Sequence, residues 1–311
     1  MVKTQILLAV YNGEDHLPAL LDSLHAQTDQ DFSVLVQDDG SADASPSLLS
    51  GLFRTDPRFV PGHECGSRLG AAGNFISLIR QADADRVFLC DQDDIWMPEK
   101  VAVLKQTMAH AEARYGADVP LLVHSDCSLV DESGSRIADS FFRHQGWDPA
   151  AVTLPRLLVQ NNVTGCTLVM NRPLCRLIAD RGRAKELFMH DWFIALTAAS
   201  FGRIVFVDRP LTAYRQHGDN AIGASRAGLL ARGVRALGQR EQAKRRILLT
   251  YTHTQVFCKL YDDLLPAEAR RAAEDYLATR TMKKIPRILA VRRMGCIMQS
   301  PVTRLGQMLF G

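Results

Sequence analysis

Residues 86–97 have the sequence RVFLCDQDDIWM, in which a short apolar run ends directly in aspartates. We predict a buried β-strand over residues 86–90, because a continuous apolar run of this length, bounded by polar residues, is typical of one. Asp91, Asp93 and Asp94 follow at its carboxyl end. Carboxylates gathered in one cleft repel each other, so they need protonation, a basic partner or a metal ion to neutralise them.

Asp91 and Asp93 have the spacing of side chains that point to the same side of a strand. A hard divalent cation such as Mg²⁺ or Mn²⁺ takes oxygen ligands, and waters and substrate phosphates complete its shell. We therefore favour a metal site at Asp91 and Asp93. The alternative is that these aspartates only cap the following helix or keep a loop soluble.

Strands and helices alternate on both sides of this motif. Expected strands are 5–10, 32–37, 58–61 and 86–90, and expected helices are 14–27, 42–53 (with Ser41 as N-cap), 73–81 and 98–115. This alternation predicts an α/β fold, with a mostly parallel sheet and helices on both of its faces. Ligands bind such sheets outside the carboxyl ends of the strands. We therefore expect Tyr11, Asp38, Asp39 and Asp91 to converge.

Beyond residue 120 the alternation loosens. Strands are expected at 121–130, 166–170, 203–207 and 211–215, and a helix at 191–200. After residue 223 the pattern becomes helical and basic. Residues 223–311 hold 17 of the 37 Lys and Arg and 6 of the 34 Asp and Glu, which leaves 20 against 28 for residues 1–222. We place a domain boundary there and expect an anionic partner for the basic region, with nucleic acid and an anionic membrane face both fitting.

The composition excludes several classes of protein. With 311 residues, 47% hydrophobic and 23% charged, the chain is an ordinary globular one. The sequence contains no run of about 18 consecutive apolar residues, so we expect no membrane-spanning helix. Residues 1–13 do not resemble a signal peptide. The seven scattered cysteines form no CxxC pair, which favours a reducing cytoplasm without a zinc site or disulfides. Neither GxGxxG nor GxxxxGK[ST] occurs, which argues against nicotinamide, flavin and P-loop nucleotide sites.

Two later stretches also carry candidate site residues. Asp191 opens a helix pattern beside Trp192, and partial desolvation there would tune its carboxylate for acid–base chemistry. Its alternative role is a helix N-cap. His217 follows a short strand in the polar stretch RQHGDN, where it could ligate a metal or contact a phosphate, or simply belong to a surface loop.

Together these residues resemble glycosyltransferase family 2, the inverting enzymes of GT-A fold that use nucleotide sugars. The resemblance lies in the order and spacing of LLAVYNGEDHL, QDDGSAD, FLCDQDDIWMPEKV, MHDWF and YRQHGDN over residues 4–222. Within the family, DQDDIW, the GNF at 73–75 and the HDW and YRQHG motifs are most similar to bacterial rhamnosyltransferases of surface-polysaccharide synthesis, such as that of O-antigen. The resemblance implies a Rossmann-like GT-A sheet with a helical basic appendage.

The resemblance also implies roles for individual residues. Asp91, Asp93 and His217 would hold Mg²⁺ or Mn²⁺, and Asp191 would be the catalytic base; His190 stands where the family more often has Glu. The implied nucleotide-sugar-binding residues are Tyr11, Asn12, Asp38, Asp39, Asn74, Asp91, Gln92, Asp93 and His217. The implied reaction moves a sugar, with L-rhamnose from dTDP-β-L-rhamnose as the best guess, to a hydroxyl of a glycan or lipid-linked acceptor.

Three alternatives stay open at this point. The chain could be a non-catalytic member of the same fold that binds a nucleotide sugar or acts as a scaffold. It could bind nucleic acid, which we rank far behind because the body is acidic and no RNP-like or zinc-finger motif occurs. Residues 280–294, basic and apolar in alternation, could dock on the inner face of the plasma membrane, or could form a solvated helical face.

Overall fold

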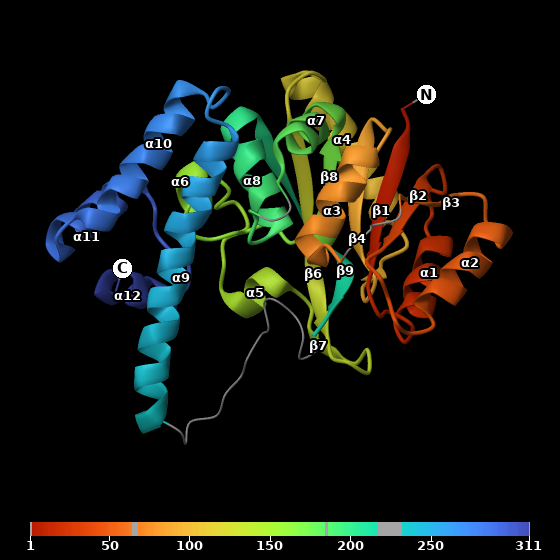
Figure 1. The fold of residues 1–311 in the computed structure, drawn as a ribbon, viewed down its shortest axis with the longest axis horizontal. Coiled ribbons are helices and arrows are strands. Elements are labelled where there is room, and N and C mark those ends of the chain that lie inside the picture. The colour runs from red at the N-terminus through yellow and green to blue at the C-terminus, as the bar shows by residue number, and fades with distance from the viewer. Residues whose placement is uncertain (1, 64–67, 184–185, 217–231, 311) are drawn as a thin grey trace. The chain divides into compact units, whose positions relative to one another are not determined.

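The computed structural model describes residues 2–63, 68–183, 186–216 and 232–310, without the side chains of 232–240 and 310 (Figure 1). The chain folds into two compact units. Unit 1 comprises Met1–Phe141 and Val163–Arg215, and unit 2 comprises Phe142–Asn162 and Gln216–Gly311. The division differs from the expected boundary at 222/223, because residues 142–162 leave the body of the chain and pack with the C-terminal region.

The described residues of unit 1 form a nine-stranded sheet. Its strands are β1 (Thr4–Val10), β2 (Ser33–Asp38), β3 (Phe59–Pro61), β4 (Arg86–Asp91), β5 (Ile95–Trp96), β6 (Leu121–Val130), β7 (Arg136–Ala138), β8 (Leu168–Asn171) and β9 (Arg203–Arg215). They lie in the order β3-β2-β1-β4-β8-β6-β9-β5, and β7 pairs with β6.

The α/β prediction is confirmed, but the sheet is mixed rather than mostly parallel. Strands β1 to β4 pair in parallel, as do β6 and β9. Strand β8 is antiparallel to both β4 and β6, and β5 is antiparallel to β9. The chain enters β8 from Cys166, which lies beside Asp91 at the carboxyl end of β4. It therefore runs back along β4 in the opposite direction.

Six helices of unit 1 cover the sheet. They are α1 (Leu17–His25), α2 (Ser45–Thr55), α3 (Gly70–Gln81), α4 (Lys100–Tyr115), α7 (Arg172–Arg181) and α8 (His190–Phe201). The short helix α5 (Phe141–Gln145) spans the junction of the units, and a 3₁₀ turn, η1 (Gly165–Thr167), precedes β8. Unit 2 contains α6 (Leu154–Leu157), α9 (Arg232–Leu260), α10 (Ala267–Ala278), η2 (Thr279–Thr281), α11 (Lys284–Met294) and α12 (Pro301–Phe310).

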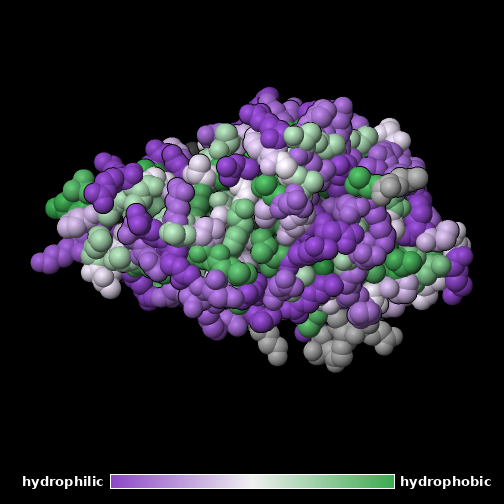
Figure 2. Space-filling view, turned by 90° about the horizontal axis from the view of Figure 1, so that it is seen from above, coloured by the Kyte–Doolittle hydropathy of each residue, from purple (hydrophilic) through white to green (hydrophobic). Residues whose placement is uncertain are grey.

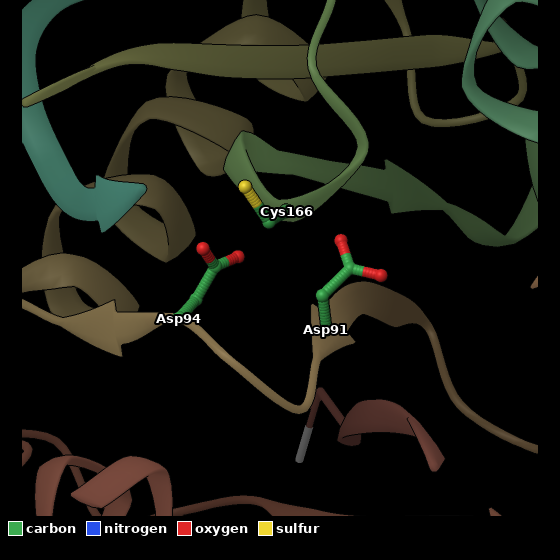
Figure 3. A group of neighbouring side chains, drawn as sticks. All are labelled: Asp91, Asp94 and Cys166. Atoms are coloured by element: carbon green, nitrogen blue, oxygen red, sulfur yellow. The ribbon is translucent and has the colours of Figure 1, made fainter. Parts of the chain in front are cut away.

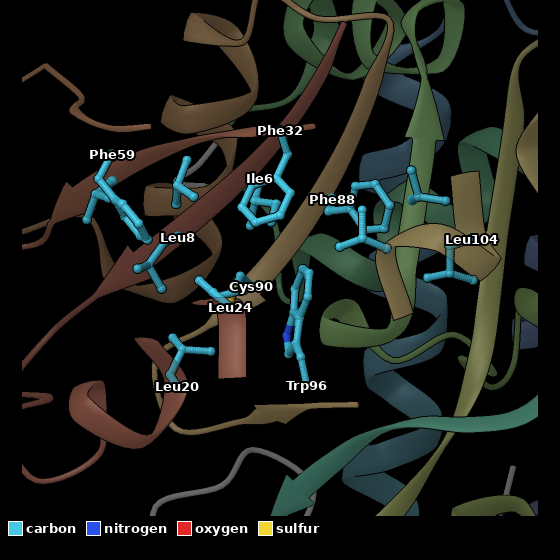
Figure 4. Close-up of a cluster of buried hydrophobic side chains, with 14 of the residues drawn as sticks. Ile6, Leu8, Leu20, Leu24, Phe32, Phe59, Phe88, Cys90, Trp96 and Leu104 are labelled. Carbon is cyan, nitrogen blue, oxygen red and sulfur yellow. The ribbon is translucent and has the colours of Figure 1, made fainter. Parts of the chain in front are cut away.

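The core of unit 1 follows from side-chain periodicity. Alternate residues of β1, Ile6 and Leu8 among them, point to one face of the sheet, where they meet Leu20 and Leu24 of α1 and Leu104 of α4 (Figure 4). Helices α1, α2 and α4 therefore cover this face. Helices α3, α7 and α8 pack against one another on the other face. The strand ends, where the loops begin, are left at the edge of this sandwich.

Three local expectations need correction. The strands expected at 203–207 and 211–215 form the single strand β9, because shifts in its register against β6 absorb the polar interruption at 208–210. The strand expected at 166–170 begins only at Leu168, after η1. Ser41 does not cap α2, whose N-cap is Ala44, because the Ser41 hydroxyl donates to Asp38 in the turn before the helix.

Candidate active site

The loop after β1 is fastened to the loop after β4 by one amide side chain. The backbone N–H of Tyr11 donates to Gln92 Oε1 at 2.7 Å, and Gln92 Nε2 donates to the Tyr11 carbonyl at 2.8 Å. A Cβ atom at Gly13 would lie 2.5 Å from Gln92 Oε1, so a larger residue there would displace the Gln92 amide from this position. Gln92 therefore acts as a clamp that brings the carboxyl ends of β1 and β4 together, as the sequence predicts.

The loop after β2 joins the same edge through Asn12. This residue has φ 47°, and its Oδ1 accepts from the Ala42 N–H at 2.8 Å, while its own N–H donates to Ser41 Oγ at 2.8 Å. Asp38 accepts from the N–H groups of Gly40 and Ser41 at 3.1 and 3.0 Å. The Asp38 carboxylate thus shapes its own turn, and any contact with a nucleotide would be additional.

Asp39 and Asn74 are buried at the inner side of these loops. The two oxygens of Asp39 accept from the backbone N–H groups of Leu69 and Gly70, each at 2.7 Å, where α3 begins. Asn74 lies in α3, and its Nδ2 donates to the Gln37 carbonyl of β2 at 3.1 Å. Both residues therefore fix α3 against the end of β2, and nucleotide binding by them stays a prediction.

An arginine that the sequence does not single out lies over Tyr11. The guanidinium carbon of Arg68 is 3.7 Å from the centroid of the Tyr11 ring, and Arg68 is exposed. This distance is that of a cation–π contact. The sequence around Arg68 shows neither a periodic pattern of apolar residues nor a motif. Its position beside Tyr11 therefore becomes visible only in the folded structure.

The carboxylates after β4 form the most unusual cluster of the site (Figure 3). Single ligand atoms of Asp91, Asp94 and Cys166 all lie within 4.8 Å of one another. Asp94 is only 1% exposed, and its oxygens make no hydrogen bond of standard geometry among the described residues; the Cys166 thiol and the Arg215 backbone approach it closely enough to lower its pKa in part. Burial and the Asp93 charge raise the pKa of Asp94 to about 7. Burial and the charges of Asp94 and Asp93 raise the pKa of Asp91 well above its usual value.

This cluster fits a hard divalent cation. Two close carboxylates, one buried and one half-buried, offer the oxygen donors that Mg²⁺ or Mn²⁺ prefers. The Cys166 thiol stays protonated, because burial and the neighbouring aspartates raise its pKa well above the usual value. The sequence singled out Asp91 with Asp93, whereas the structure gathers Asp91 with Asp94. Strand β4 ends at Asp91, so the two-residue period of a strand no longer applies to the residues that follow.

Two further residues complete the surroundings of the cluster. The Asp93 carbonyl accepts from Arg215 Nε at 3.1 Å, and Arg215 Nη1 donates to the Glu132 carbonyl at 2.7 Å. Arg215 thus holds the loop after β4 against the turn after β6. His217, the third expected metal ligand, lies outside the described residues.

Lys100 supplies a buried positive charge that the sequence analysis missed. Its Nζ donates to the Cys166 carbonyl at 2.5 Å and to Thr212 Oγ1 at 2.9 Å, and lies 3.4 Å from the centroid of the Trp96 ring. Burial lowers the pKa of Lys100 to about 8, so most of it stays charged at pH 7. In the sequence it is indistinguishable from an ordinary lysine at the start of a helix.

Asp191, the expected base, lies on the other side of η1. It is buried in the first turn of α8, and its Oδ1 accepts from the Trp192 N–H at 2.6 Å. Its charge is one of those that raise the pKa of Asp91. The two carboxylates lie beside consecutive residues of η1, Asp191 beside Gly165 and Asp91 beside Cys166. Asp191 is not the N-cap of α8, because that position is held by Met189.

His190 and Gly165, the first residue of η1, pack beside Asp191. The His190 ring packs on Phe75 with centroids 4.2 Å apart, and burial lowers the pKa of His190 to about 3, so the imidazole is neutral. A Cβ at Gly165 would lie 2.9 Å from His190 Nε2 and 3.5 Å from Asp191 Cβ. Turn η1 therefore presents Cys166 to the carboxylate cluster and Gly165 to Asp191, which fixes the separation of the two carboxylate sites.

The fold and sequence match known proteins. TarS 1–349 of S. aureus in complex with UDP superposes with a TM-score of 0.54 at 14% identity, over 98% of this chain and 90% of that one. The mannosyltransferase PcManGT from Pyrobaculum calidifontis, in complex with GDP-Man and Mn²⁺, gives 0.52 at 17% identity, over 94% and 73%. Both likenesses concern the fold alone.

The sequence comparisons carry the assignment further. The dTDP-rhamnosyl transferase RfbG of Shigella flexneri is 28% identical over 231 residues, which cover 70% of this chain and 74% of RfbG. Residues 5–174, more than half of the chain, match the family described as Glycosyl transferase family 2. The chain therefore belongs to glycosyl transferase family 2 and is a glycosyltransferase of GT-A fold.

Proposed function

We propose that this glycosyltransferase moves L-rhamnose from dTDP-β-L-rhamnose to a hydroxyl of a glycan or lipid-linked acceptor in cell-surface polysaccharide synthesis. The observation that carries the proposal is the close pair of half-buried Asp91 and buried Asp94 beside Cys166, whose neighbour Gly165 lies against Asp191. The choice of rhamnose is supported by the named activity of RfbG and by the DQDDIW and HDW motifs.

Asp91 and Asp94, with Asp93 and His217 as the sequence suggests, would hold Mg²⁺ or Mn²⁺, which when bound would offset the charge of the departing nucleoside diphosphate. In the structure, the unsatisfied oxygens of Asp94 support this assignment. The positive charge of Lys100, whose ammonium group donates to the Cys166 carbonyl, lowers the pKa values of Asp91 and Asp94. This charge therefore offsets part of the cost of keeping the two carboxylates ionised in the protein interior.

The remaining roles belong to side chains around the donor and the acceptor. Tyr11 with Arg68 would contact the nucleoside, next to the loops and the helix that Asn12, Asp38, Asp39, Asn74 and Gln92 hold in place. Asp191 would accept the proton of the acceptor hydroxyl as that oxygen attacks the anomeric carbon. Attack from the face opposite the leaving group inverts the anomeric centre, so a β-linked donor would give an α-L-rhamnoside.

A donor screen tests the proposal. The melting temperature of the chain would be measured with dTDP-rhamnose, UDP-sugars and GDP-sugars, each with Mn²⁺ and with EDTA. We expect dTDP-rhamnose to stabilise the wild type only with Mn²⁺, and Asp91→Asn to lose this effect. Asp139→Asn, an exposed aspartate of unit 1, is the matched control and should behave as wild type. Stabilisation by another donor would overturn the choice of sugar, and no stabilisation by any donor would favour a non-catalytic scaffold.

A further inference from the structure

Helix α11 of unit 2 presents an apolar ridge to solvent. Ile285 and Leu289 of this helix are 72% and 61% exposed, and Met282, in the extended segment just before it, is 37% exposed. The four-residue spacing of Ile285 and Leu289 places them on one face of the helix. Large apolar side chains are seldom exposed together without a partner to cover them.

Helix α12 repeats the same arrangement. Val302, Leu305 and Leu309 are 82%, 59% and 45% exposed, and their spacing of three and then four residues places them on one face of the helix. The opposite side of α12 packs on α9, so the exposed ridge is the face that the fold leaves uncovered. The two ridges together are called the apolar ridges below.

Positive charge surrounds the apolar ridges. Residues 276–311 contain no aspartate or glutamate. Their basic residues are Arg280, Lys283, Lys284, Arg287, Arg292, Arg293 and Arg304. Within the described part of the chain, none of these side chains forms an ion pair with a carboxylate. Figure 2 shows hydrophobic and hydrophilic atoms gathered side by side over this region, at the left of the view.

The segment between the two helices is firmly attached, so the ridges are a built surface and not a frayed end. The Cys296 N–H donates to the Val291 carbonyl at 2.9 Å. Gln307 of α12 accepts from the Met298 N–H at 3.0 Å and donates to the Cys296 carbonyl at 2.8 Å. Arg156 Nη1 donates to the Ile297 carbonyl at 3.0 Å.

We propose that the apolar ridges and the basic residues around them form a docking surface for an anionic lipid bilayer. Apolar side chains on one face and Lys and Arg beside them are the two features that hold a helix in the plane of such a bilayer. A second copy of the chain is a poor occupant, because a symmetric contact would oppose two surfaces of the same positive charge. No helix in the described ranges is long and apolar enough to cross a membrane, so attachment would be peripheral.

Vesicle co-sedimentation of the full chain tests this proposal. Phosphatidylcholine vesicles with and without phosphatidylglycerol would be compared at low and high salt. We expect binding only to the anionic vesicles, weakened by salt. Ile285→Ser with Leu289→Ser, and separately Lys283→Glu with Lys284→Glu, should each weaken binding at least about tenfold. The matched control is Leu48→Ser with Arg54→Glu, an exposed apolar and basic pair on α2, which should bind as wild type.

The outcomes separate this proposal from the proposed reaction. The stabilisation by dTDP-rhamnose should be unchanged in the serine variant and in the glutamate variant, because the donor site belongs to unit 1. An unchanged melting temperature without donor would show that both variants fold. Absence of wild-type binding, equal binding to neutral vesicles, or variants that bind as wild type would overturn the proposal. A wild-type dimer in sedimentation equilibrium that the ridge variants lose would instead identify the surface as a contact between copies.

Discussion

At the scale of the residue, the site is a balance of buried charges. Asp94 makes no hydrogen bond of standard geometry to the described part of the chain, and burial with the Asp93 charge raises its pKa to about 7 although the Cys166 thiol and the Arg215 backbone lie close to it. Lys100 lies close by, with its ammonium group held by a carbonyl, a hydroxyl and an indole ring. Burying these groups without water is unfavourable unless they neutralise each other or bind a ligand. Perturbed carboxylates of this kind are typical of functional sites.

Asp191→Asn tests the role of the base. The amide keeps the shape of the side chain but cannot take a proton, so the rate of sugar transfer should fall about 10²- to 10⁴-fold. Binding of donor and Mn²⁺ should stay within about twofold of wild type, because Asp191 is assigned to the acceptor side. Transfer rates and calorimetric titration of the donor measure the two effects separately. An equal loss of binding and rate would contradict the assignment.

His124 provides a test of stability against pH. It is buried in β6 against Phe206, and burial lowers its pKa to about 3, below the usual 6.5 of an unfolded chain. As pH falls below 6.5 the unfolded chain binds this proton first, so the free energy of unfolding should decrease. His124→Phe should remove about 2 kcal/mol of the decrease between pH 7 and pH 5.

Urea unfolding at both pH values would measure this difference. The exposed His110→Phe in α4 is the matched control and should keep the wild-type pH dependence. If His124→Phe lost as much stability on acidification as the wild type, the buried histidine would not account for the acid sensitivity.

At the scale of the element, the site depends on ties between strand ends. Gln92 joins the loop after β4 to the backbone of Tyr11, and Asp39 joins the loop after β2 to the start of α3. These ties use side chains from the very motifs that the sequence singles out for binding. These motifs therefore determine the shape of the loops as well as the candidate binding residues.

Gln92→Ala should loosen the loop that carries Tyr11. The variant loses two hydrogen bonds, each worth about 1 kcal/mol, and donor affinity should fall about tenfold with the fold intact. Calorimetric titration with dTDP and Mn²⁺ would measure the affinity. Gln92→Glu, which keeps only the acceptor, should lie between Gln92→Ala and wild type. Wild-type affinity in Gln92→Ala would show that the clamp has no part in binding.

The sequence predicts the elements whose signal is local. Strands β1, β2 and β4 are buried on both faces, so each is a continuous apolar run that can be found without a structure. Strand β9 was read as two strands, because the bulges that carry it past residues 208–210 depend on β6. Asp94 was missed as a partner of Asp91 for a similar reason: the loop after β4 takes its shape from Gln92 and Arg215.

At the scale of the whole molecule, the division into units could not be read from composition. Residues 142–162 lie between two segments of unit 1 in the sequence, yet they belong to unit 2. Within unit 2, α6 packs on α10, and Gln299 bonds to Gln160 and Asn162 at 2.9 Å each. These contacts join residues more than a hundred positions apart, which no local pattern reveals.

A truncated chain of residues 1–222 should therefore be a poor fragment. It retains 142–162 but lacks α10 and Gln299, so buried side chains such as Leu157 lose their cover. We expect the fragment to aggregate on size exclusion, to bind a hydrophobic dye and to melt at a lower temperature than the full chain. A fragment that is monodisperse, binds no dye and melts with the full chain would contradict the division into units.

The central claim is that Asp91 and Asp94 hold the divalent cation that binds the donor diphosphate. Electron paramagnetic resonance of Mn²⁺, titrated with the chain in the presence of dTDP, tests it most directly. Wild type and Asp139→Asn should bind Mn²⁺, whereas Asp94→Asn should bind it at least about tenfold more weakly while keeping its fold. Mn²⁺ binding by Asp94→Asn that equals that of wild type would contradict the claim.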